Sequence, residues 1–312
     1  MQQDSKIYVA GHTGLIGSAI VRKLAEKGFI NVILKSHCEL DLKDGQAVRE
    51  FFSGHRPEYV FLAAGKVGGI MENKTYPADF IETNLAIQMN VMTNARDIGV
   101  RKLVFFGSSC MYPRECPQPM HEEMLMTGKP EPTSIAYAMS KLAGVEMCLS
   151  FNRQSGGLNF IPVIPNSAYG PNDNFNPNSG HVLSVLIRRF HDAKTANDAS
   201  ITLWGTGIPK REFIHADDIA DASVFLASNQ VEAELPINIG VGKDYSIKEL
   251  AGMIANVVGY KGLIDWDTTK PDGAPRKLLD STRMLELGWR PAKEFEEGLV
   301  NTYQWFLENA AN

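Results

Sequence analysis

Short apolar runs alternate with amphipathic helical patterns along the first half of this 312-residue chain. The apolar runs, each of a length suited to a β-strand, are residues 6–10, 31–35, 59–64, 102–107 and 159–165. The helical patterns between them are residues 16–27, 45–52, 79–98 and 136–153. Strands that alternate with helices form right-handed crossovers, which make the strands parallel and cover both faces of the sheet. The alternation therefore predicts an α/β fold with a doubly wound parallel sheet.

The pattern loosens after Asn166. Residues 169–180 read YGPNDNFNPNSG, and this density of Gly, Pro and Asn predicts a long loop of the kind that often binds a ligand. A helix over residues 181–193, a strand at ITLWG and a last helical segment from Glu294 follow. We expect a first domain over residues 1–165 and a smaller α/β lobe, partly interleaved with it, over residues 166–312.

Charge and cysteine usage exclude several classes of protein. The formal net charge is -5, so no global positive field exists to hold nucleic acid or an anionic membrane. The four cysteines, Cys38, Cys110, Cys116 and Cys148, form no CxxC pair and are too few for a disulfide scaffold, so we expect no metal site. No stretch approaches the roughly 18 apolar residues of a membrane helix, and no signal peptide precedes the first strand. We expect a soluble, reduced, cytoplasmic protein.

A glycine-rich segment connects the first strand to the first helix, with Gly11, Gly14 and Gly17 spaced G-x-x-G-x-x-G. The first glycine permits a tight turn, the second lets backbone N–H groups approach a pyrophosphate, and the third lets the helix pack closely on the sheet. The order of strand, glycines and helix predicts a Rossmann dinucleotide site.

The end of the second strand reads LKSHCELDL, with Lys35 and His37 where an NAD-binding protein carries an acid. A cation there favours a 2′-phosphate and hence NADP(H). The alternative, which stays open, is that Lys35 is only a solvated side chain.

Tyr137 and Lys141 lie four residues apart on a predicted helix and so share one face, while Ser108 follows the fourth strand. A neighbouring ammonium stabilises a phenolate, so we expect Lys141 to lower the pKa of Tyr137. Tyr137 would then pass a proton to a carbonyl oxygen as hydride arrives, and Ser108 would donate a hydrogen bond to that oxygen. One such Tyr–Lys pair is often only structural, but the glycine loop beside it makes ketone reduction the better interpretation.

With these motifs the chain resembles the extended short-chain dehydrogenase/reductases, and among them the epimerase-reductases of GDP-linked 4-keto-6-deoxy sugars. The matching segments, which span nearly the whole chain, are GHTGLIGSA, AAGKVGGIMENKTYPADF, GSSCMYP, YAMSK, YGPNDNF, HVLSVLIRRFH, WGTGIPKREFIHADD and KPDGAPRKLLD. The resemblance implies NADPH-dependent 3,5-epimerisation and 4-keto reduction of GDP-4-keto-6-deoxy-D-mannose to GDP-L-fucose. It also implies a homodimer built through the helices at residues 79–98 and 136–153.

The resemblance further implies that Cys110 and His181 form an acid/base pair, with Cys110 as the base and His181 as the acid. Protons next to a ketone are acidic, and thiol and imidazole both titrate within reach of neutral pH. On sequence alone, a structural role is an equally good interpretation for both residues, with Cys110 as a small buried apolar side chain and His181 as the partner of a local hydrogen bond.

The remaining expected contacts are as follows. For the cofactor they are Gly11, His12, Thr13, Gly14, Leu15, Ile16, Gly17, Lys35, His37, Asp41, Leu42, Ala63, Ala64, Tyr137, Lys141, Pro165 and Ala168. For the substrate they are Ser109, Asn166, Ser167, Arg189, Trp204, Arg211, Asp272 and Lys277. The resemblance assigns four of these to the nucleotide diphosphate, namely Arg189, Trp204, Arg211 and Lys277. Helix geometry leaves Arg188 open beside Arg189, and Trp204 could equally belong to the core.

Three departures from the family pattern keep alternatives open. Thr13 and His37 stand where arginines are common in the family, and residues 165–168 read PNSA rather than PTNL. A GDP-linked dideoxyhexose or 6-deoxyheptose would need the same groups. A redox-neutral nucleotide-sugar 4-epimerase and a catalytically silent NADP-sensing protein are the alternatives from other classes.

Overall fold

Six parallel strands form the central sheet of the computed structural model, which describes residues 1–156, 159–231, 233–270 and 272–311. The strand order is β2-β1-β3-β4-β5-β9, and every neighbouring pair runs parallel. The strands are β1 (Ile7–Ala10), β2 (Val32–Ile33), β3 (Tyr59–Leu62), β4 (Lys102–Phe106), β5 (Phe160–Pro165) and β9 (Ile237–Ile239). The predicted α/β class with a doubly wound parallel sheet is confirmed.

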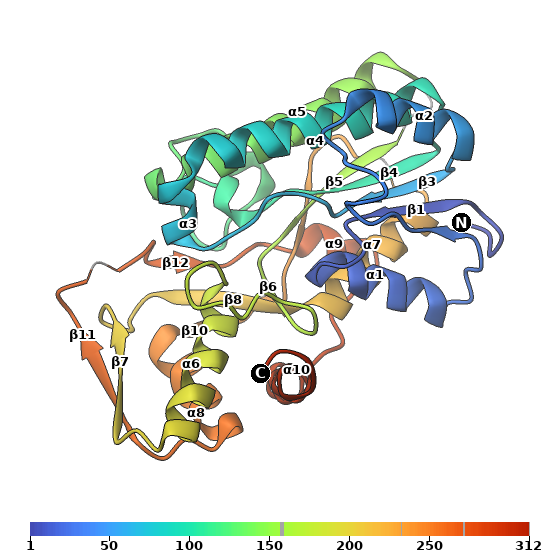
Figure 1. Cartoon of the computed structure of the whole chain (residues 1–312). Helices are drawn as coiled ribbons and strands as arrows, with labels where there is room; N and C mark the ends of the chain where they lie inside the picture. Colours follow the sequence, from blue (N-terminus) through green and yellow to red (C-terminus); the bar gives the residue numbers. More distant parts are fainter. Residues whose placement is uncertain (157–158, 232, 271, 312) are drawn as a thin grey trace.

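Helices cover both faces of this sheet (Figure 1). One face carries α1 (Leu15–Glu26) and α7 (Ala216–Ser228), and the other carries α2 (Gly45–His55), α4 (Pro77–Asp97) and α5 (Ile135–Gln154). Side chains of strands β1, β3, β4 and β5 alternate between two hydrophobic cores, one on each face. Burial on both faces explains why these strands read as continuous apolar runs.

The second half of the chain contributes to both parts of the molecule. Strand β9 extends the central sheet beside β5, and α7 packs against α1. The smaller lobe holds β6 (Ser167–Tyr169), β7 (Ser200–Trp204), β8 (Lys210–His215), β10 (Asp244–Ser246), β11 (Leu263–Asp267) and β12 (Arg276–Lys277). Its helices are α6 (Val182–Ala196), α8 (Ile247–Val258), α9 (Thr282–Glu286) and α10 (Phe295–Asn309). The division at residue 165 stays a prediction.

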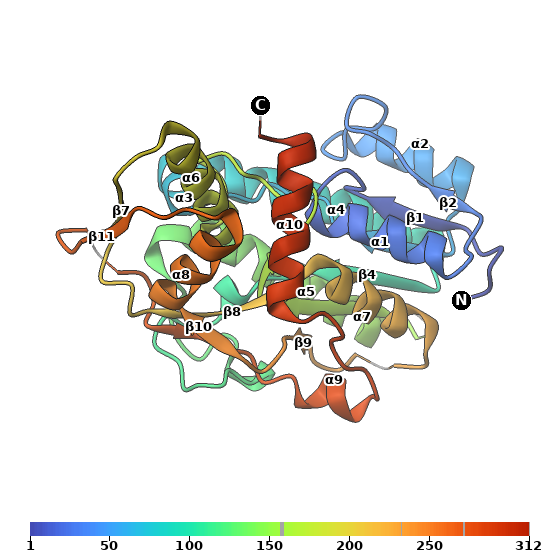
Figure 2. The same cartoon turned by 90° about the horizontal axis from the view of Figure 1, so that it is seen from below.

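A third core fills the smaller lobe, in which α6, α8 and α10 enclose Phe190, Leu250 and Phe306. Figure 2 shows α10 between the pair α6 and α8 and the helices α1 and α7 of the larger part. Its buried residues Leu299, Tyr303 and Phe306 belong to the core of the smaller lobe.

Strand β8 is fixed to its surroundings by a fully buried carboxylate, Glu212. It accepts hydrogen bonds from the backbone N–H groups of Val241 and Gly242, both at 2.7 Å, and of Leu279 at 3.0 Å. It also accepts one from the side-chain amide of Asn166. These bonds hold the end of β5, the segment after β9 and the segment after β12 at one place.

The strands and helices that were predicted agree with the structure to within a few residues, whereas several elements between β7 and α10, among them α8 and β9, were not predicted individually. Two differences concern the segments near the site. Helix α3 (Ile70–Thr75) was not expected, because six residues between Gly69 and Pro77 are too few to show a helical period. Tyr169, expected to begin the long loop, ends strand β6, where its buried ring packs against His215. Within the described residues, no helix combines the length and apolarity that a membrane crossing requires.

Candidate active site

The glycine loop has the shape that a dinucleotide phosphate requires. Gly11 has a φ of +80°, and a Cβ there would lie 2.7 Å from the backbone nitrogen of Ala64. A Cβ at Gly17 would overlap the Gly11 carbonyl, whereas one at Gly14 would meet nothing closer than 3.6 Å. No side chain caps α1, and the buried Nδ1 of His12 has no hydrogen-bond partner. An uncapped helix N-terminus next to open space fits the pyrophosphate of a dinucleotide.

The segment after β2 carries acids as well as the expected cation. Lys35 Nζ lies 3.3 Å from Glu39, and the same carboxylate accepts hydrogen bonds from the Ser36 N–H at 2.9 Å and the Ser36 hydroxyl at 2.7 Å. His37 Nδ1 lies 3.8 Å from Asp41. The donors expected for a 2′-phosphate are thus present, and Glu39 competes for them.

Ser108 links the end of β4 to the next turn. Its side chain caps the short helix η1 (Ser109–Met111) and accepts a hydrogen bond from the Cys110 N–H at 3.2 Å. Ser109 is buried, and its expected contact with the substrate stays a prediction. The cap therefore fixes the position of Cys110 relative to the Ser108 hydroxyl.

Tyr137 and Lys141 lie on α5, as expected, but their electrostatics differ from the expectation. Burial raises the pKa of Tyr137, the Cys110 charge raises it further, and a hydrogen bond with Ser108 opposes this. Burial also lowers the pKa of Lys141 to about 8. Lys141 Nζ donates to the Phe106 carbonyl at 2.9 Å and lies 5.9 Å from the centre of the Tyr137 ring. The expectation that Lys141 lowers the pKa of Tyr137 is therefore wrong for this structure, which keeps the phenol protonated.

Cys110 lies beside a cation from the other lobe. Lys277 Nζ, on β12, donates to Cys110 Sγ at 3.5 Å. Burial by itself raises the pKa of the Cys110 thiol, but the Lys277 charge, hydrogen bonds from Ser108 and Lys277 and the charge of His181 outweigh it. The net shift is downward. Lys277 thus contacts the thiol in this structure, and its expected contact with the nucleotide diphosphate stays a prediction.

His181 is the N-cap residue of α6 and has an acidic partner that the sequence did not single out. Its Nδ1 lies 3.8 Å from Asp173, whose carboxylate is almost fully buried and also accepts a hydrogen bond from Ser184. Burial lowers the pKa of His181, but the hydrogen bond and charge of Asp173 and the charge of Cys110 outweigh it, so the pKa is raised. Asp173 lies in the YGPNDNF segment, and that motif was the one sequence feature that pointed to this region of the chain.

The structure separates the two arginines of α6. Arg188 Nε lies 3.0 Å from Asp192, its guanidinium bonds to the Ala310 carbonyl at 3.1 Å, and it is therefore engaged with α10. Arg189 donates to the Thr202 carbonyl on β7 at 2.6 Å. This placement favours Arg189 over Arg188 as the substrate contact.

Trp204 and Asp272 flank the same side of the smaller lobe. Trp204 ends β7, and 61% of its surface is exposed, which contradicts its alternative reading as a core residue. Asp272 accepts hydrogen bonds from the backbone N–H and the hydroxyl of Thr206 at 2.9 and 2.7 Å.

Arg211 on β8 pairs in register with Lys277. Burial lowers the pKa of Arg211, whereas the charges of Cys110, Glu131 and Asp272 raise it. Arg211 therefore lies within electrostatic reach of Cys110, Glu131 and Asp272.

Asn166 and Ser167 serve mainly internal bonds in this structure. The Asn166 amide group donates to Glu212 and to the Lys277 carbonyl, and its oxygen accepts from the Ser167 N–H at 3.0 Å. Their expected substrate contacts stay predictions.

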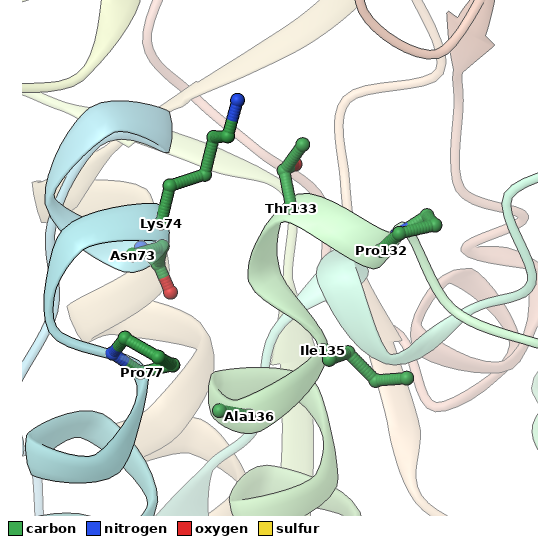
Figure 3. A pocket seen from close by; sticks show the side chains of 7 residues that line it. All are labelled: Asn73, Lys74, Pro77, Pro132, Thr133, Ile135 and Ala136. Atoms are coloured by element: carbon green, nitrogen blue, oxygen red, sulfur yellow. The ribbon is translucent and has the colours of Figure 1, made fainter.

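A pocket of about 420 Å³ opens between α3 and the start of α5 (Figure 3). Its walls include Lys74, Pro77, Thr133 and Ala136, and the buried Oδ1 of Asn73 has no partner. The Asn73 amide group holds the Gly68 and Gly69 carbonyls at 2.8 and 3.0 Å. The Gly69 N–H in turn donates to the Ser179 carbonyl at 2.9 Å, so this wall is connected to the loop that ends at His181.

In the part of the chain that the structure describes, no three His, Cys, Asp or Glu side chains gather as a metal site would require. The site instead holds a thiol, an imidazole, a phenol, a hydroxyl and two lysines from both lobes. Such a set can remove and return protons at carbon and protonate a carbonyl oxygen.

Comparisons with known proteins agree on the kind of protein to which this chain is similar. The model of the NAD dependent epimerase/dehydratase family matches residues 7–240. GDP-L-fucose synthase 1 of Arabidopsis thaliana is 52% identical over 310 residues, covering 99% of this chain and 95% of that protein. GDP-L-fucose synthase of Escherichia coli (strain K12) is 48% identical over 312 residues, covering 97% of each. A solved GDP-mannoheptose C4 reductase from Campylobacter jejuni with NADP bound has a TM-score of 0.89 at 41% identity and covers 98% of this chain and 99% of its own.

Proposed function

The chain belongs to the NAD dependent epimerase/dehydratase family, and within it we propose that it converts GDP-4-keto-6-deoxy-D-mannose to GDP-L-fucose. The reaction comprises epimerisation at C3 and C5 and an NADPH-dependent reduction at C4. The observation that carries the proposal is the geometry around Cys110, whose N–H is bonded to the Ser108 hydroxyl at 3.2 Å and whose sulfur lies 3.5 Å from Lys277 Nζ. The charge of Cys110 also raises the pKa values of Tyr137 and His181, so both groups lie near it. A carbon-acid pair and a carbonyl-reducing set therefore lie within one electrostatic environment.

Epimerisation needs a base on one face of the sugar ring and an acid on the other. Cys110, with its lowered pKa, removes the proton next to the ketone, and the electron pair of the C–H bond moves into an enolate. Hydrogen bonds from the Ser108 and Tyr137 hydroxyls stabilise the enolate oxygen. His181, with its raised pKa, returns a proton to the opposite face. The result is inversion at that carbon.

Reduction needs a proton for the carbonyl oxygen at the moment when its carbon is reduced. NADPH, bound at the glycine loop, supplies the hydride. Tyr137 suits the proton transfer because burial keeps its phenol protonated, and Ser108 holds the same oxygen. Lys141 Nζ, bonded to the Phe106 carbonyl, is held 5.9 Å from the centre of the Tyr137 ring.

The test is product analysis by NMR after incubation with GDP-4-keto-6-deoxymannose and NADPH in heavy water. We expect NADPH absorbance to fall and deuterium to appear at C3 and C5 of GDP-L-fucose. Deuterium uptake without loss of NADPH would contradict the reductase role. A product changed only at C4, without net NADPH use, would identify a redox-neutral 4-epimerase, and binding of NADPH with no turnover would identify a silent sensor.

A GDP-linked 6-deoxyheptose is the second candidate substrate. The 41% identity to the heptose reductase over nearly the whole chain favours it. The same assay with a GDP-4-keto-heptose decides between the two, because the better substrate has the higher kcat/KM.

We also propose a homodimer through α4 and α5, which form the outer layer of the molecule (Figure 1). Leu85 and Met89 on α4 and Ile135 and Met139 on α5 are exposed. Large apolar side chains on neighbouring helices mark an interaction surface. Light scattering after size-exclusion chromatography should give a dimer, and Met89→Lys with Met139→Lys should give a monomer. Ile30→Lys, at an apolar residue exposed elsewhere, is the matched control.

The cytoplasm is the proposed location. All four cysteines are free thiols, and Cys38 is exposed, which fits a reducing compartment. Cell fractionation tests this, and recovery in an oxidising compartment would contradict it.

A further inference from the structure

Lys277 is the one cation that the smaller lobe brings into direct contact with a reacting group among the described residues. It is separated from Cys110 by 167 positions in the sequence, so the contact exists only when the two lobes are folded together. We propose that Lys277 is a positioning residue that holds Cys110 as a thiolate before the substrate binds. Its part in the reaction rests on the proposed function, whereas its effect on the thiol does not.

The backbone around Lys277 is fixed by strand pairing and by hydrogen bonds from several segments, and this restricts where its ammonium can lie. Lys277 pairs in register with Arg211 in the parallel β12–β8 ladder. Its carbonyl accepts from the Asn166 amide at 3.3 Å. The next two N–H groups, of Leu278 and Leu279, donate to Gln118 at 2.8 Å and to Glu212 at 3.0 Å. The backbone is therefore already ordered, and only the rotamer entropy of the lysine side chain opposes the contact with the thiol.

The position of Cys110 is fixed independently. Its N–H is bonded to the Ser108 hydroxyl at the start of η1, directly after the buried strand β4. The thiol is half-buried, so a neighbouring charge is less screened there than at the surface. A cation 3.5 Å from the sulfur therefore favours the thiolate over the thiol.

The other groups that face Cys110 do not replace Lys277. Burial raises the thiol pKa, and the Lys277 charge is the largest influence that lowers it, followed by the hydrogen bonds of Ser108 and Lys277 and the charge of His181. Tyr137 is a neutral phenol and carries no charge that would stabilise the thiolate. Arg211 and Cys110 influence each other only through their charges, without a hydrogen bond. Removing the Lys277 ammonium takes away the largest lowering charge and one of the two hydrogen bonds, so the pKa of the thiol should rise.

The charges of Lys277 beside Cys110 and of Asp173 beside His181 also explain how one thiol can act at two carbons in turn. Each inversion breaks a C–H bond, forms an S–H bond on Cys110, breaks an N–H bond on His181 and forms a C–H bond on the opposite face. The reaction starts from a Cys110 thiolate and a protonated His181, and it leaves a thiol and a neutral imidazole. The Lys277 and Asp173 charges favour loss of the proton from sulfur to water and gain of one from water by the imidazole. The site is thereby reset for the second carbon.

The test is the pH dependence of Cys110 alkylation by iodoacetamide in the full chain without substrate, followed by mass spectrometry of the Cys110 peptide. We expect Cys110 in the natural chain to react at pH 7, and Lys277→Met to react about tenfold more slowly there and to need higher pH. Lys277→Arg, which keeps the charge, should retain most of the reactivity. The exposed Cys38 is the internal reference and should react equally in all three proteins.

An unchanged Cys110 profile in Lys277→Met overturns the proposal. If that variant then shows only a raised KM, Lys277 binds the nucleotide diphosphate instead. Circular dichroism and NADPH binding verify that the variants are folded, and Lys277→Gln provides a second charge-free variant should methionine disturb β12. Because alkylation needs no substrate, its result stands even if the proposed sugar is wrong.

Discussion

His181 Nδ1 lies 3.8 Å from the carboxylate of Asp173, which is itself almost fully buried. The acid of the proposed epimerisation is therefore held by a residue of its own loop. Asp173 also accepts a hydrogen bond from Ser184 in the first turn of α6, so the loop and the helix share one anchor.

Asp173→Asn should move the alkaline limb of the deuterium-uptake profile to lower pH. The Asp173 charge raises the pKa of His181, so its loss leaves the imidazole neutral at a lower pH, where it can no longer donate a proton. We expect uptake at pH 8 to fall about tenfold while uptake near pH 6 falls less. An equal loss at every pH, with a lower melting temperature, would show that Asp173 only stabilises the loop.

Tyr137→Phe should separate the two halves of the reaction. Loss of the phenol proton should lower NADPH oxidation by about 10²- to 10⁴-fold. Deuterium uptake should fall less, because Cys110 and His181 remain and Ser108 can still donate a hydrogen bond to the enolate oxygen. Parallel measurements of NADPH absorbance and deuterium uptake check this. Equal loss of both would contradict the assignment of Tyr137 as the proton donor of the reduction step.

Glu39→Gln should bind NADPH more tightly. In the structure Glu39 occupies the Ser36 N–H, the Ser36 hydroxyl and the Lys35 ammonium, which a 2′-phosphate would otherwise use. The contacts are exposed, so we expect a gain of only about two- to five-fold in affinity, measured by fluorescence titration. NADH is the control ligand, since it lacks the 2′-phosphate and should gain less. Weaker NADPH binding would mean that Glu39 instead preorganises the turn.

Gly17→Ala and Gly14→Ala form a matched pair in the glycine loop. The new methyl group at residue 17 overlaps the Gly11 carbonyl and should lower the free energy of unfolding by about 1–3 kcal/mol as well as abolish NADPH binding. At residue 14 it meets no close atom of the protein, so stability should hold while NADPH binding weakens. Urea denaturation and NADPH titration distinguish the two, and equal loss of stability would contradict the assignment.

Glu212→Gln should destabilise the fold without reaching the reacting atoms directly. The new amide nitrogen cannot accept the hydrogen bonds that Leu279 and Asn166 now donate. Leaving buried donors unpaired costs about 1–3 kcal/mol, which chemical denaturation can measure. An unchanged midpoint of unfolding would show that water replaces these bonds.

Much of this architecture could be predicted from the sequence, because each buried parallel strand reads as an apolar run and each helix as a periodic pattern. The glycine loop was predictable for a similar reason, since Gly11 and Gly17 have room for nothing larger. The Tyr137 and Lys141 pair was placed on one helix face by its spacing alone.

Contacts between distant segments could not be predicted in this way. Lys277 meets Cys110 only through the pairing of β12 with β8, and no periodicity reports that pairing. The direction of the Tyr137 pKa depends on how deeply α5 is buried, which outweighs the nearby lysine. Asp173 was hidden because its loop has no regular pattern in which an acid would stand out.

Strand β9 and helix α7, which lie beyond residue 165, complete the sheet that holds the glycine loop. A ribosome must therefore add Ile239 before the outer edge of β5 is covered. Until then the emerging chain exposes an unpaired strand and the apolar face of α1, both of which invite aggregation. Separating the two halves by truncation should accordingly yield insoluble fragments rather than an isolated nucleotide-binding domain.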